Sequence, residues 1–164
     1  MFKCSISRHS GWSTAVLAGV IAGTSATLAQ VLLWLVFTDA FPAILFRDAR
    51  LTAALVLGSS ALPPPATFDT GIMLAATLVH FALSVVYAAL LARLTSGLEN
   101  VPALLAGAAF GIVLYFINLY GFTAVFPWFA QARGWITLIA HAVFGVTITL
   151  VCRYPAAKST QEVS

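Results

Sequence analysis

Four hydrogen-bonding side chains stand out because they interrupt long apolar segments of the chain: His80, His141, Gln30 and Asn118. Polar and ionisable side chains are costly inside a bilayer, and they usually face the interior of a helix bundle or a water-filled cavity. Imidazoles can hydrogen-bond across helices, exchange protons near neutral pH or ligate a haem iron. The four residues therefore form a candidate polar intramembrane site.

Helix geometry places the two histidines at similar depths. His80 follows Asp69 by eleven residues and His141 follows Arg133 by eight, so at 1.5 Å per residue they lie about 16 and about 12 Å from the helix starts. Three interpretations stay open: hydrogen bonding that holds helices together, a polar path or cavity for a small solute, ion or proton, and axial ligation of a b-type haem for electron transfer. Of these three, only the third involves a cofactor, and we expect the protein to bind no cofactor and no metal.

Residues for catalysis are nearly absent. No pair of carboxylates lies inside an apolar segment, since Asp39, Asp48 and Asp69 all fall outside them, and no phosphate-binding or His-Glu-x-x-His motif occurs. The two cysteines, Cys4 and Cys152, lie near opposite ends of the chain without the spacing of a metal site or a disulfide framework. We expect a non-enzymatic protein.

The amino-acid composition of the chain is typical of an integral membrane protein. Of the 164 residues, 61% are hydrophobic and only 8% are charged, with a mean hydropathy of +0.99, whereas about a quarter of the residues of a soluble domain are charged. The net charge of +3 is the difference between eight basic and five acidic residues, and the basic residues are scattered at the ends of apolar segments. No basic run with interleaved aromatic residues exists, so we expect no nucleic-acid partner.

Four segments are long and apolar enough to cross a bilayer, which takes about 20 residues: 13–37, 70–92, 101–123 and 135–152. The stretch 42–61 carries three charged residues and a short apolar run, so it predicts an interfacial helix that the following prolines end. The expected fold is an all-α polytopic membrane bundle, with four transmembrane helices and one interfacial helix in a single domain over 1–164.

An internal repeat relates the first and third spans. In each, two glycines four residues apart are followed by an amide eleven residues after the first glycine: Gly19, Gly23 and Gln30, then Gly107, Gly111 and Asn118. The segment that begins at His80 likewise resembles the segment that begins at His141. This order predicts two parallel helical hairpins about a pseudo-two-fold axis along the membrane normal. Gly-x-x-x-Gly lets helices approach closely, so we expect these four glycines to hold the first and third spans together.

Charge and aromatic residues predict the orientation in the membrane. Five basic residues fall on the side of both termini and three on the opposite side, which predicts cytoplasmic termini. On the opposite side, Trp128, Arg133 and Trp135 are expected to anchor the chain at the membrane interface.

The segments 51–69, 80–87, 118–123 and 126–129 resemble a group of small four-helix inner-membrane proteins of proteobacteria that is distantly similar to the YagU-like family. The resemblance covers most of the chain from Leu51 to Arg153. It implies a bacterial inner-membrane location and no particular activity. Relatives sometimes carry a sodium:proline symporter label, which disagrees with a chain of four spans that lacks the broken helices of such carriers. Besides the lipid bilayer, the expected partners are a second copy of the chain or a larger membrane protein that it would serve as an accessory subunit.

Overall fold

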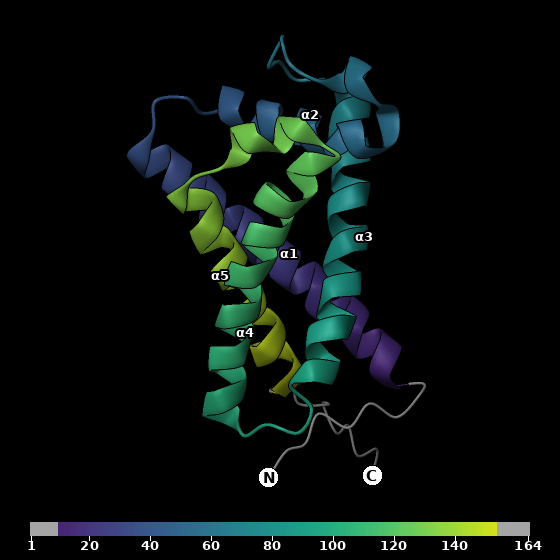
Figure 1. Ribbon diagram of the computed structural model, residues 1–164, viewed down its shortest axis with the longest axis vertical. Coiled ribbons are helices and arrows are strands. Elements are labelled where there is room, and N and C mark those ends of the chain that lie inside the picture. The colour runs from purple at the N-terminus through teal and green to yellow at the C-terminus, as the bar shows by residue number, and fades with distance from the viewer. Residues whose placement is uncertain (1–9, 154–164) are drawn as a thin grey trace, which may run out of the picture.

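Four long helices form the bundle in the computed structural model, which describes residues 10–153 (Figure 1). They are α1 (Ser10–Phe37), α3 (Thr70–Leu94), α4 (Asn100–Phe116) and α5 (Trp135–Arg153). Each contributes a segment that is long and apolar enough to cross a membrane: Trp12–Phe37, Thr70–Leu94, Asn100–Ala124 and Trp135–Arg153. No strand occurs among the described residues. The prediction of an all-α bundle with four membrane helices is confirmed.

The bundle is built around α1 and α5. Helix α1 packs against both α3 and α5, while α4 packs mainly against α5. The start of α1, the end of α5 and the connection 95–99 share one end of the bundle, called here the loop end (Figure 1).

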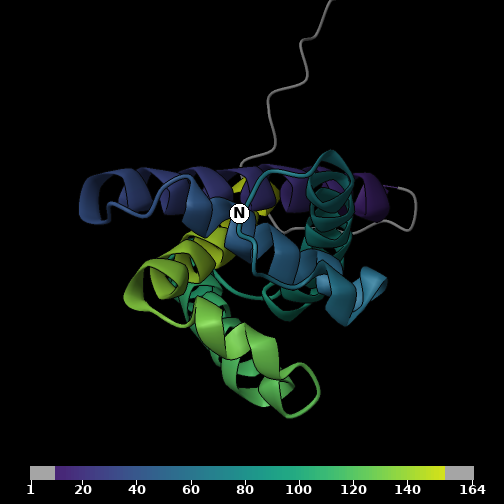
Figure 2. The same ribbon diagram turned by 90° about the horizontal axis from the view of Figure 1, so that it is seen from above.

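A shorter helix, α2 (Ala43–Leu57), lies across the other end, called here the α2 end, and is followed by the 3-10 turn η1 (Ser59–Ala61) (Figures 1 and 2). It packs on α3. The guanidinium of Arg50, which is 8% exposed, donates to the carbonyls of Ala61 and Thr67, both at 3.3 Å, and so fixes the chain that follows α2. Arg47 pairs with Asp48 at 2.7 Å, yet burial still raises the pKa of the Asp48 carboxyl.

The third span differs from the single continuous α-helix expected over 101–123. Helix α4 ends at Phe116 and continues as a π turn, η2 (Ile117–Gly121), then as 3-10 turns η3 (Phe122–Ala124) and η4 (Pro127–Ala132). Because a π turn breaks the regular hydrogen-bond ladder, the carbonyl of Leu119 is free to accept from Nε of Arg133 at 2.8 Å. The hydrogen bond from Arg133, fourteen residues later in the chain, therefore stabilises the π turn.

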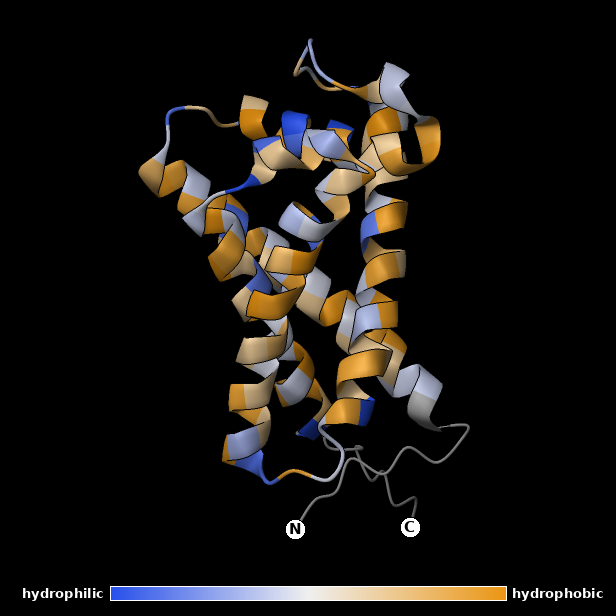
Figure 3. Ribbon diagram, in the orientation of Figure 1, coloured by the Kyte–Doolittle hydropathy of each residue, from blue (hydrophilic) through white to orange (hydrophobic). Residues whose placement is uncertain are grey.

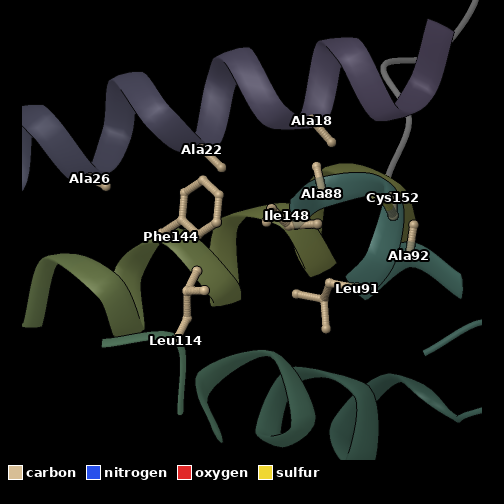
Figure 4. Close-up of a cluster of buried hydrophobic side chains, with 10 residues drawn as sticks. All are labelled: Ala18, Ala22, Ala26, Ala88, Leu91, Ala92, Leu114, Phe144, Ile148 and Cys152. Atoms are coloured by element: carbon tan, nitrogen blue, oxygen red, sulfur yellow. The ribbon is translucent and has the colours of Figure 1, made fainter. Parts of the chain in front are cut away.

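Apolar residues predominate along the length of the membrane helices (Figure 3), and many large ones are exposed on the outside of the bundle. Leu32, Leu78 and Leu105 are more than half exposed, at 61%, 63% and 67%. In water such a surface would drive association, whereas in a bilayer it meets lipid chains. Inside, small side chains of α1 pack against larger ones of α3, α4 and α5 (Figure 4). This loop-end cluster consists of Ala18, Ala22, Ala26, Ala88, Leu91, Ala92, Leu114, Phe144, Ile148 and Cys152.

Candidate functional site

The glycines of the first span join α1 to α3. A Cβ added at Gly19 would lie 2.7 Å from Cα of Val85, and one added at Gly23 would lie 3.0 Å from Nε2 of His80. Neither distance leaves room for a methyl group, so the two helices touch along this face.

The glycines of the third span join α4 to α5 instead of α1. A Cβ at Gly107 would lie 2.7 Å from the carbonyl oxygen of Gly145, and one at Gly111 would overlap the carbonyl oxygen of His141. The four glycines are packing positions, but each pair packs against the next membrane helix in the chain: α3 for the first pair and α5 for the second. The expectation that they hold the first and third spans together is thus corrected.

His80 lies on the face of α3 that meets α1. Its Nε2 is 3.5 Å from the hydroxyl of Thr27, at the long end of hydrogen bonding. The ring of Phe81 packs edge-on against the imidazole, with ring centroids 5.2 Å apart. This histidine therefore contacts the first helix, beside Gly23.

Gln30 and His141 meet at one threonine of α5. The amide nitrogen of Gln30 donates to the hydroxyl of Thr137 at 3.4 Å. The carbonyl of the same threonine lies 2.8 Å from Nδ1 of His141, one turn later in the helix. The His141 ring packs edge-on against Tyr115 of α4, with ring centroids 5.7 Å apart.

Asn118 projects from the π turn toward α3. Its side-chain oxygen accepts a hydrogen bond from the hydroxyl of Tyr87 at 3.2 Å. Nearby, the hydroxyl of Tyr115 accepts from the backbone N–H of Gly134 at 3.1 Å. The π turn thus places the amide where it connects the third span to the second.

These contacts form three groups of polar side chains: Thr27 with His80, Gln30 with Thr137, His141 and Tyr115, and Tyr87 with Asn118. Together we call them the polar network. Toward the loop end lies the loop-end cluster. Toward the α2 end lies a second apolar group, the α2-end cluster: Leu51, Tyr115, Leu119 and Ala132, with Leu62, Trp128, Phe129 and Leu138 packed against them. Two members of the polar network contact these apolar groups: Tyr115 belongs to the α2-end cluster, and Tyr87 packs against the loop-end cluster.

The two imidazoles contact different helices, because His80 lies against Thr27 of α1 and His141 against Tyr115 of α4. Both histidines thus take part in contacts between helices. Within residues 10–153 no three His, Cys, Asp or Glu side chains converge as a metal site.

Two of the expected interface anchors contact protein groups. The indole N–H of Trp128 donates to the carbonyl of Leu51 at 3.1 Å. The guanidinium of Arg133 lies 4.1 Å from the ring centre of Tyr120 and also binds the π turn. Trp135 is 51% exposed, as an interface residue would be, with its ring edge-on to Phe37 at 5.1 Å.

Sequence reasoning missed the threonine partners and one arginine. Thr27 is four residues after Gly23, so the glycine face of α1 was the signal that could have found it. Arg153, expected only as a basic residue of the tail, is 5% exposed. It donates to the side chain of Asn100 at 3.0 Å and to the carbonyls of Thr95 and Leu98 at 2.9 and 2.7 Å.

No protein-family model, curated protein or solved structure matches this chain.

Proposed function

We propose that this chain is a non-enzymatic integral protein of the bacterial inner membrane with a structural role. The observation that carries the proposal is that each of the four candidate polar residues contacts a different element of the bundle. His80 contacts α1, Gln30 contacts α5, His141 contacts α4 and Asn118 contacts α3. A set of this kind holds helices in register, since polar contacts between membrane helices contribute about 0.6–2 kcal/mol each.

The tight apolar packing of the loop-end cluster favours this role over a channel. The loop-end cluster contains Leu91 and Ile148, which are 1% and 0% exposed. A static path for a solute would need polar groups through this half of the bundle as well. Transport would therefore require a conformational change, and a structural role does not.

The contacts of the two hairpins support the proposed duplication. Gly23 lies against His80, and Gly111, 88 positions later, lies against His141. Thr27 also contacts His80, and its counterpart 88 positions later, Tyr115, contacts His141. The same register in both hairpins is what a repeated unit produces. Membership of the group similar to the YagU-like family is part of this proposal and rests on the sequence resemblance.

The proposal also includes an orientation in the membrane and a kind of partner. The start of α1 and the end of α5 lie at the loop end, and the excess of basic residues on this side favours a cytoplasmic location for it. As a small structural unit, the chain would bind a second copy or a larger membrane protein. Purification under mild solubilisation distinguishes the two, because a larger partner would remain bound and a second copy would appear as a doubled mass.

We expect His80→Ala and His141→Ala each to lower the free energy of unfolding in mixed micelles by about 1 kcal/mol. Proton and solute flux through liposomes that contain either variant should equal the flux of the parent protein. Thr77→Ala, an exposed position on α3, is the control and should unfold like the parent.

If a histidine variant lost a proton or solute flux while its free energy of unfolding stayed unchanged, the result would favour transport over the structural role. A Soret absorption band of the parent protein that is lost in both histidine variants would replace it by haem-based electron transfer.

A further inference from the structure

A short segment at the α2 end is bounded by two unobstructed glycines. The segment, called here the strap, is Phe122–Arg133 and includes η3 and η4. A Cβ at Gly121 would meet only the carbonyl oxygen of Phe116, at 4.0 Å, and one at Gly134 would meet nothing within 4 Å. No side-chain packing at these two positions therefore opposes a change of backbone angles, which suits hinge positions.

The strap covers one side of the polar network. Its residues Trp128, Phe129 and Ala132 pack in the α2-end cluster around Tyr115, which is 5% exposed. The His141 ring lies directly against Tyr115. Strap side chains thus stand between the α2 end and these two polar side chains.

Few polar contacts hold the strap in place. Among the hydrogen bonds of residues 10–153, the bond from the Trp128 indole to the Leu51 carbonyl is the one that joins the strap to α2. The contacts of Arg133 with Leu119 and of Gly134 with Tyr115 lie at the hinge end. By contrast, the loop-end side of the network is closed by the packed membrane helices themselves.

We propose that the strap is a lid over the polar network. When the Trp128–Leu51 hydrogen bond breaks, the strap pivots about Gly121 and Gly134. Water and small hydrogen-bonding solutes then reach Tyr115 and His141 from the α2 end, while the loop-end cluster stays closed. This device goes beyond the structural role proposed above and does not depend on it.

Labelling of a single cysteine tests the lid. Cys4→Ser and Cys152→Ala remove the native thiols, and Leu138→Cys places a thiol among the residues packed in the α2-end cluster. A charged, membrane-impermeant methanethiosulfonate is added to one side of sealed vesicles at a time. We expect slow labelling from the α2 end alone, and Trp128→Phe should accelerate it roughly 2- to 10-fold because one hydrogen bond is lost.

Two controls make the result specific. Trp135→Phe, which alters an exposed tryptophan outside the strap, should leave the labelling rate of Leu138→Cys unchanged. Ile148→Cys, in the loop-end cluster, should stay unlabelled with either tryptophan variant. Equal rates with and without Trp128→Phe, labelling from the loop end, or no labelling of Leu138→Cys in any background would overturn the lid. Labelling of Ile148→Cys that rises in parallel would also overturn it, because the whole bundle would then be opening.

Discussion

Replacement of Gly111 by alanine is expected to lower the free energy of unfolding by about 3 kcal/mol, the upper end of the usual cost of overpacking. The added Cβ would overlap the carbonyl oxygen of His141, which is backbone and cannot rotate away. Helices α4 and α5 would have to separate, and the contact of Gly107 with Gly145 would open with them. Unfolding of the purified protein in mixed micelles measures the loss.

The matched control is Gly71→Ala in the first turn of α3. A Cβ there would lie 3.4 Å from a side-chain oxygen of Asp69, an ordinary contact. Alanine is the better helix former, so this variant should unfold like the parent or slightly later. If Gly111→Ala were as stable as Gly71→Ala, the close approach of α4 to α5 at this glycine would be wrong.

Arg153→Ala is expected to cost about 3 kcal/mol as well, since it removes three hydrogen bonds from a buried charged group. The arginine connects the end of α5 to the α3–α4 connection at Thr95 and Leu98. Without it, two carbonyls of the α3–α4 connection lose their donor, and the loop end should loosen before the rest of the bundle. Hydrogen exchange resolved by peptide would show faster exchange in 95–100.

Arg93→Ala is the control, because Arg93 lies at the same end of the bundle but is exposed. Its loss should change the free energy of unfolding by less than about 0.5 kcal/mol. Arg153→Lys should recover only part of the stability, since an ammonium group cannot span three acceptors in the planar geometry of a guanidinium. Equal effects of Arg93→Ala and Arg153→Ala would show that charge at this end, and not the buried contacts, matters.

The positions of the helices could be predicted from the sequence because bilayer thickness fixes the length of each apolar segment. The expected spans 13–37 and 70–92 differ by at most three residues at either end from α1 and α3. The π turn after Phe116 could not be predicted in the same way. It depends on Arg133, which reaches back to Leu119 from a later part of the chain.

The candidate site was found in part. Constant helix rise placed His80 and His141 at similar depths, and both belong to the polar network. A Gly-x-x-x-Gly pattern indicates a close helix contact without naming the partner, so the pairing of Gly107 and Gly111 with α5 required the three-dimensional packing. The threonines were missed because a threonine in an apolar helix ordinarily bonds its own backbone and gives no signal of an interhelical contact.

A double-mutant cycle on Tyr87 and Asn118 measures whether the polar network holds the helices together. Their hydrogen bond of 3.2 Å joins α3 to the π turn. Tyr87→Phe and Asn118→Ala, alone and together, should give a coupling free energy of about 0.5–1.5 kcal/mol in mixed-micelle unfolding. The pair Tyr87→Phe and Thr77→Ala should be additive. A coupling free energy of zero between Tyr87 and Asn118 would show that this contact does not hold α3 to the third span, and the structural role of the polar network would be wrong.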